Sequence, residues 1–129
     1  MTSRRTLLVE DDPDTCEALT RILTRRGYEV DCANSVRQAL AKLDGARFDE
    51  APESIVLDLM LPDGSGVELL RHVRQSGLPV RVAVATGAGD TDLMSDAILL
   101  KPDAFFTKPI DATELVSWLA SKRDEDTSS

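Results

Sequence analysis

The chain has 129 residues, 42% of them hydrophobic, and a formal net charge of −8. A chain of this length fits one domain that buries a core without disulfides or metals, and its acidity opposes the phosphate backbone, so we expect no direct nucleic-acid contact. Its apolar runs fall far short of the roughly 20 residues that span a bilayer, and the first run is too short for a signal peptide, so we expect no membrane contact and a cytoplasmic location.

Apolar runs rich in Val, Ile and Leu alternate along the chain with segments of helical period. In chain order they predict a strand at 6–10, a helix from Pro13 to a stop at Gly27, a strand at 28–32, a helix between Ser35 and Gly45, a strand at 54–57, a helix at 66–75, a strand at 79–85, a helix at 90–100, a strand at 104–107 and a last helix that starts at Asp111. The second strand alternates apolar with charged residues, which predicts a sheet edge. This order indicates an α/β fold with a parallel sheet and helices on both faces, because parallel strands are joined by helical crossovers.

Polar side chains follow the carboxyl ends of four predicted strands. Glu10 and Asp11 follow the first, Asp58 the third, Thr86 the fourth and Lys108 the fifth. Because ligands of an open parallel sheet bind outside these ends, we expect the five side chains to converge on one site. Carboxylates about 4 Å apart repel by on the order of 4 kcal/mol per pair at an effective dielectric near 20. A hard divalent cation bound by these oxygens would remove the repulsion, so we expect a metal site here. Mg²⁺ fits because it keeps waters that a phosphate can replace.

The same residues indicate phosphoryl chemistry. Asp58 can act as a carboxylate nucleophile and form an aspartyl phosphate. Lys108 supplies a positive charge and Thr86 a hydroxyl donor for the phosphoryl oxygens. An alternative reading of Glu10 and Asp11 is a helix N-terminus, where carboxylates favour the helix dipole. We expect Asp12 to be only the N-cap of that helix.

Four successive motifs resemble those of response-regulator receiver domains of two-component systems: residues 7–13 (LLVEDDP), residues 58–66 (DLMLPDGSG), Thr86 and Lys108-Pro109. The resemblance covers about residues 5–121. It implies a flavodoxin-like, doubly wound, five-stranded parallel sheet of strand order 2-1-3-4-5. It also implies one receiver domain over residues 1–129, with a core at 5–121 and a charged tail at 122–129.

The resemblance assigns a role to each site residue. Asp58 corresponds to the phosphoacceptor, and Thr86 and Lys108 correspond to the phosphoryl-binding pair. The Mg²⁺ ligands correspond to Asp11, Asp58 and the backbone carbonyl of Met60, with Glu10 acting through water. Phe105 matches the aromatic switch position, for which plain core packing is the alternative, and the Lys108-Pro109 bond is expected to be cis.

The partners implied are a sensor histidine kinase or a histidine phosphotransfer protein, together with a downstream protein, and the chain is expected to be a monomer or a phosphorylation-dependent dimer. We expect a signalling switch that catalyses only its own Mg²⁺-dependent phosphorylation and a slow dephosphorylation. We expect the aspartyl phosphate to hydrolyse slowly, because Met60 and Ala88 cannot orient the attacking water. Family resemblance places these two side chains beside the path of that water. Output is expected through protein contact or onward phosphotransfer.

Three rival interpretations were weighed. A haloacid-dehalogenase-type phosphatase needs a second aspartate two residues after the nucleophile, where this chain has Met60. A flavodoxin-like redox protein needs a Ser/Thr/Gly-rich loop after the first strand, where this chain has acids. A pseudo-receiver that binds partners without phosphate is disfavoured by the intact constellation.

Lys101-Pro102-Asp103 replaces the family's usual turn before the fifth strand, which leaves the position of the fourth helix open. Lys101 is rejected as the site lysine because it follows a helix.

Overall fold

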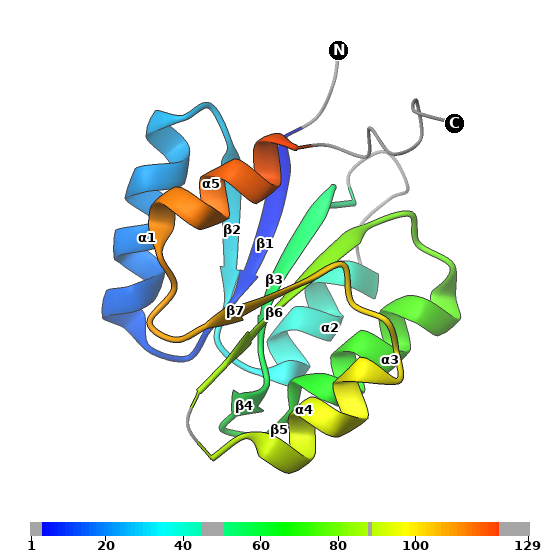
Figure 1. Cartoon of the computed structure of the whole chain (residues 1–129). Coiled ribbons are helices and arrows are strands. Elements are labelled where there is room, and N and C mark those ends of the chain that lie inside the picture. Colours follow the sequence, from blue (N-terminus) through cyan, green and yellow to red (C-terminus); the bar gives the residue numbers. More distant parts are fainter. Residues whose placement is uncertain (1–3, 45–50, 88, 122–129) are drawn as a thin grey trace.

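The computed structural model describes residues 4–44, 51–87 and 89–121. Its elements, labelled in Figure 1, are β1 (Arg5–Val9), α1 (Pro13–Arg25), β2 (Glu29–Ala33), α2 (Val36–Asp44), β3 (Ser54–Asp58), β4 (Met60–Leu61), β5 (Gly64–Ser65), α3 (Gly66–Ser76), β6 (Arg81–Thr86), α4 (Thr91–Ile98), β7 (Ala104–Thr107) and α5 (Ala112–Ala120). Five strands form a parallel sheet of order β2-β1-β3-β6-β7, and β4 with β5 forms a small antiparallel ladder. With that short ladder set aside, the order is the predicted 2-1-3-4-5, so the predicted fold class is confirmed.

Helices cover both faces of the sheet. In Figure 1, α1 and α5 lie on one face and α2, α3 and α4 on the other. Successive side chains of a strand point to opposite faces, so Leu7 and Val9 of β1 pack with the α2–α4 layer and Leu8 packs with the α1–α5 layer. β3 and β6 are buried along their whole lengths, whereas β2 alternates and forms the predicted edge.

Two element boundaries differ from the sequence-based prediction by two residues, and the other differences are of one residue. β6 begins at Arg81 rather than at residue 79, because Pro79 has no N–H to give to the sheet and the Arg81 N–H makes the first bond, to the Glu53 carbonyl at 3.1 Å. α4 ends at Ile98 rather than at residue 100. The sequence left the position of α4 open; beyond the carboxyl end of this helix, Lys101 has a positive φ of 55°.

The guanidinium of Arg74, in α3, holds the end of α4 in place. It donates to the carbonyls of Leu100 at 3.2 Å and Lys101 at 2.8 Å, and it pairs with Asp103 at 3.2 Å. These carbonyls follow the helix and lack intrahelical partners, so a long side chain from a neighbouring helix satisfies them. The carboxyl end of α4 is therefore attached to α3.

Some sequence-based expectations concern residues outside the described ranges. These are the helix stop at Gly45, the tail at 122–129 and Ala88. At the amino end of β3, the Glu53 N–H donates to the Arg5 carbonyl at 2.9 Å. Among the described residues, no helix combines the length and the apolar character that crossing a bilayer requires.

The turn from β5 into α3 brings two backbones into close contact. The Gly66 N–H donates to the Leu59 carbonyl at 2.9 Å. A Cβ atom on Gly66 would lie 2.2 Å from the carbonyl oxygen of Asp58, so only glycine fits at this position. The first turn of α3 thus packs directly on the backbone of Asp58.

We predict that Gly66→Ala lowers the free energy of unfolding by about 2 kcal/mol, because the added methyl group must displace backbone rather than a side chain. Gly64→Ala is the matched control, since its Cβ would meet the flexible carboxylate of Glu68 at 3.2 Å. Urea unfolding of both variants measures the difference. Equal midpoints for the two variants would show that the contact at Gly66 is not tight.

Candidate functional site

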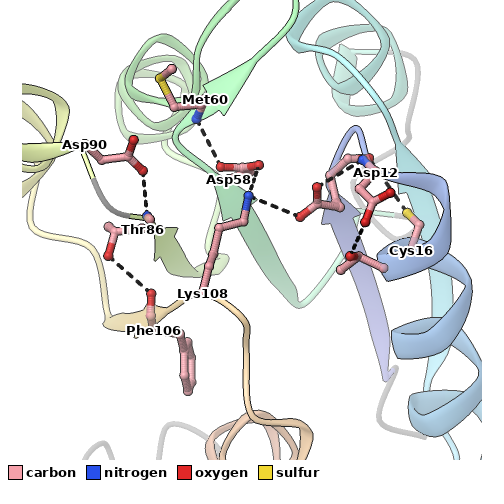
Figure 2. A network of polar contacts seen from close by, with 11 residues as sticks. Asp12, Cys16, Asp58, Met60, Thr86, Asp90, Phe106 and Lys108 are labelled. Carbon is pink, nitrogen blue, oxygen red and sulfur yellow. Dashed lines mark hydrogen bonds and ion pairs between the residues drawn. The ribbon is translucent and has the colours of Figure 1, made fainter.

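The carboxyl ends of four strands bring the five polar side chains singled out in the sequence to one edge of the sheet. Ligand oxygens of Glu10, Asp11 and Asp58 lie within 4.8 Å of one another. Lys108 extends from the end of β7 across to Asp58, as Figure 2 shows. Asp58 is only 2% exposed and Glu10 is also buried, whereas Asp11 is exposed. Residues from distant parts of the chain therefore form one acidic site with a lysine in it.

Both carboxylate oxygens of Asp58 are bonded. Lys108 Nζ lies 2.6 Å from Oδ2, and the Met60 N–H donates to Oδ1 at 3.0 Å. Lys108 Nζ also lies 3.7 Å from Glu10 Oε1. Partial burial by itself lowers the pKa of Lys108, but the hydrogen bond and charge of Asp58, followed by the charge of Glu10, outweigh it and raise the pKa. The ammonium group is therefore charged at neutral pH.

The buried carboxylate of Glu10 indicates that the site suits an additional cation. Burial raises the pKa of Glu10, and the hydrogen bond from the Asp12 N–H and the charge of Lys108 only partly oppose this. One ammonium group thus faces the carboxylates of Glu10, Asp11 and Asp58. Oxygen ligands with excess negative charge fit a hard divalent cation such as Mg²⁺. The Met60 carbonyl as a further ligand stays a prediction.

Thr86 at the end of β6 is buried, whereas Phe105 on β7 is exposed. The Thr86 hydroxyl donates to the Phe106 carbonyl at 3.5 Å, so it is engaged with β7 rather than with Asp58 (Figure 2). Phe105 is 41% exposed, which argues against plain core packing. Its neighbour Phe106 points to the other face of the sheet, where its ring meets that of Trp118 edge-on at 6.2 Å. The switch role of Phe105 stays a prediction.

Two aspartates near the site were not recognised from the sequence. Asp63, which lies within the motif at residues 58–66, accepts hydrogen bonds from the backbone N–H groups of Val36 at 2.8 Å and Arg37 at 2.9 Å. It caps α2 and so attaches the β4–β5 turn to that helix. Asp90, interpreted as the first residue of a helix, is buried and accepts a hydrogen bond from the Gly87 N–H at 2.7 Å. No local sequence signal identifies either contact.

Other predicted features agree with the structure. Asp12 occupies the N-cap position of α1, although its carboxylate bonds the Thr15 hydroxyl at 2.6 Å rather than a backbone amide. The Lys108-Pro109 bond is cis. Cys16 and Cys32 are free and half-buried, and burial, followed by the neighbouring Cys32 thiol, raises the pKa of Cys16 to about 12. A thiol that stays protonated at neutral pH is a poor nucleophile.

Comparison with known proteins agrees with this geometry. The family model described as "Response regulator receiver domain" matches residues 6–120. The chain belongs to this family. Receiver domains of two-component response regulators are signalling switches, and this chain is homologous to those that accept a phosphoryl group.

Individual relatives support the assignment. A response-regulator receiver domain protein of Methanospirillum hungatei has a similar structure, with a TM-score of 0.86, 27% identity and 98% coverage of each chain. A Burkholderia pseudomallei response regulator whose structure has a phosphorylated aspartic acid, a calcium ion and citrate gives a TM-score of 0.79 and 25% identity, over 98% of this chain and 72% of that one. The transcriptional regulatory protein DltR of Streptococcus agalactiae is 33% identical over 113 residues, 88% of this chain and 49% of DltR. The chain thus spans about half the length of that curated relative.

Asp63 gives the fold a specific pH dependence. The N–H groups of Arg37 and Val36 hold the pKa of Asp63 below its ordinary value of 3.8. A lowered folded-state pKa stabilises the fold fully above 3.8, and this contribution is lost as the pH falls through the lower folded-state value. We predict that Asp63→Ala lowers the unfolding temperature most at neutral pH and progressively less in acid.

Thermal unfolding of the wild type and Asp63→Ala between about pH 3 and pH 7 tests this linkage. Asp96→Ala, which removes an exposed carboxylate of α4, is the control and should differ from wild type by a constant amount. A constant difference for Asp63→Ala as well would contradict the proposed cap.

Proposed function

We propose that Asp58 accepts a phosphoryl group from a phosphohistidine on a sensor histidine kinase or a histidine phosphotransfer protein. The observation that carries the proposal is the geometry of Asp58: a buried carboxylate at the end of a central strand, bonded by Lys108 and the Met60 N–H within a cluster of acids. The phosphorylated aspartic acid of the Burkholderia pseudomallei relative supports the same assignment.

The reaction is an exchange of one bond to phosphorus for another. A carboxylate oxygen of Asp58 attacks the phosphorus atom, the phosphorus–nitrogen bond to the donor imidazole breaks, and its electron pair stays on that nitrogen. Lys108 and Thr86 bind the transferred oxygens. Glu10, Asp11, Asp58 and the Met60 carbonyl would hold Mg²⁺, which when bound neutralises charge between carboxylate and phosphoryl oxygens.

The phosphoryl group would then act on the surface formed by α4, β7 and α5. The Thr86 hydroxyl, which donates to the Phe106 carbonyl, would turn to the phosphoryl group and free that carbonyl. Phe105 of β7 is exposed, and so are Ile98 and Leu99 at the carboxyl end of α4. A change in the packing of Phe105 would alter an apolar surface that a downstream protein can bind.

The remaining expectations are part of the same proposal. We place the protein in the cytoplasm, as a monomer or a phosphorylation-dependent dimer, with a receiver core at residues 5–121. The name of DltR as a transcriptional regulatory protein contrasts with our expectation of no direct nucleic-acid contact. That expectation concerns the residues of this chain, whose net charge is −8, and stays a prediction.

The first test of this function is phosphorylation itself. Incubation with acetyl phosphate and Mg²⁺ should add one phosphoryl group, visible by intact mass, and chelation of the metal should prevent it. Asp58→Asn should remain unmodified because the amide is not a nucleophile. Asp92→Asn, which neutralises an exposed aspartate in the first turn of α4, should label like the wild type. Labelling of Asp58→Asn to the wild-type extent would refute the assignment.

The second test concerns the lifetime of the aspartyl phosphate. The Met60 side chain is 57% exposed beside Asp58 and cannot orient an attacking water. We predict that Met60→Asn shortens the lifetime about tenfold, because a positioned polar group directs the water. Met60→Leu, which stays apolar, is the matched control and should decay like the wild type.

The decay of phosphorylated protein after removal of the donor measures both lifetimes. An unchanged or longer lifetime in Met60→Asn would mean that water positioning at residue 60 does not limit hydrolysis. Equal acceleration in Met60→Leu would instead point to loss of methionine shielding.

A further inference from the structure

The side chain of Asp90 makes an unusual contact for its position. Asp90 is the N-cap residue of α4, where an aspartate ordinarily accepts a hydrogen bond from the second or third helical amide. Here no such bond forms. The carboxylate is 7% exposed and turns back to accept from the Gly87 N–H at 2.7 Å. The side chain therefore holds the loop that follows β6 rather than the helix it precedes.

Gly87 lies beside the phosphorylation site. Gly87 directly follows Thr86, and a Cβ atom on it would lie 3.7 Å from Cδ of Lys108 and 3.8 Å from Oδ2 of Asp90. In Figure 2, Asp90 and Thr86 lie on the same side of Lys108, and their dashed hydrogen bonds go to partners other than Asp58. The two donors at the end of β6 are thus both engaged with acceptors of the chain itself, the Phe106 carbonyl and the Asp90 carboxylate.

We propose that Asp90 is a positioning residue of the switch: its carboxylate is an internal anion that occupies the Gly87 amide until a phosphoryl group on Asp58 displaces it. This proposal rests on the proposed phosphorylation of Asp58. An amide has one proton, and a carboxylate and a phosphoryl oxygen at the same proton repel each other. Phosphorylation therefore weakens the hydrogen bond between Asp90 and Gly87. The free energy needed to break this bond is part of the free energy needed for the conformational change.

The place of Asp90 at the start of α4 determines which end of the helix moves when Asp90 leaves Gly87. Its carbonyl accepts the first bond of α4, from the Met94 N–H at 2.8 Å, so movement of Asp90 moves the amino end of the helix. The carboxyl end is attached to α3 through Arg74. Displacement of Asp90 consequently swings α4 about its fixed end.

Beryllofluoride with Mg²⁺, which mimics a phosphoryl group on a carboxylate, tests the proposal. Asp90→Asn keeps the size of the side chain but removes its charge, and Asp90→Ala removes the acceptor. Both should bind beryllofluoride about fivefold more tightly than the wild type, because a hydrogen bond to a charged acceptor no longer has to be broken. Asp92→Asn, with the same charge change on the exposed side of the first turn of α4, should bind like the wild type.

Calorimetric titration gives the dissociation constants, and thermal unfolding of the free proteins gives their stabilities. A merely structural role predicts lower stability and weaker binding in both variants, whereas competition predicts tighter binding even where stability falls. Wild-type affinity or weaker binding in Asp90→Asn overturns the proposal, and this variant serves where Asp90→Ala does not fold. Failure of the wild type to bind beryllofluoride, or binding by Asp58→Asn, would contradict the proposed function itself.

Discussion

The ion pair between Asp58 and Lys108 constrains the whole functional edge of the sheet. A buried carboxylate without a partner is strongly unfavourable, so the 2.6 Å contact with Lys108 is what allows Asp58 to lie in the middle of the sheet at 2% exposure. Because β6 lies between β3 and β7, the lysine must reach across the end of β6, which brings Thr86 and Gly87 beside it. The close approach of Gly66 to the Asp58 carbonyl limits movement from the other side. The position and the neighbours of Asp58 are thus tied to this ion pair.

The same pair leaves the site short of positive charge. Lys108 bonds Asp58 closely and Glu10 only at 3.7 Å, and Glu10 keeps a raised pKa, chiefly through burial. A divalent cation would relieve this excess, and a phosphoryl group would then add negative charge that only a cation makes tolerable. In the proposed function, metal binding and phosphorylation would therefore be linked through the electrostatics of the site as well as through shared ligands.

The strand order was predicted through the resemblance to receiver domains. The convergence of Glu10, Asp58, Thr86 and Lys108 was predicted from the residues, because each follows the carboxyl end of a strand and parallel strands end on the same side of the sheet. The sequence did not predict where α4 ends, since that depends on Arg74 in another helix. It also missed the cap that Asp63 gives to α2, 27 residues away in the chain from Val36. The sequence also did not predict the direction of the Asp90 side chain. Asp90 was expected at a helix start, and the structure shows that its carboxylate accepts from the Gly87 N–H. Such contacts join segments whose relative placement no local pattern encodes.

The hydrogen-bond donors around Asp58 form two groups. These groups determine which side of the site would rearrange when Asp58 is phosphorylated. Lys108 and the Met60 N–H already bond Asp58, so they need little movement to serve a phosphoryl group there. The Thr86 hydroxyl and the Gly87 N–H bond other acceptors and must leave them. A phosphoryl group brings three strong acceptor oxygens and so draws on the second group. In the proposed switch, rearrangement would therefore begin at the end of β6 and pass to β7 and the amino end of α4, while the Met60 side of the site would stay as it is.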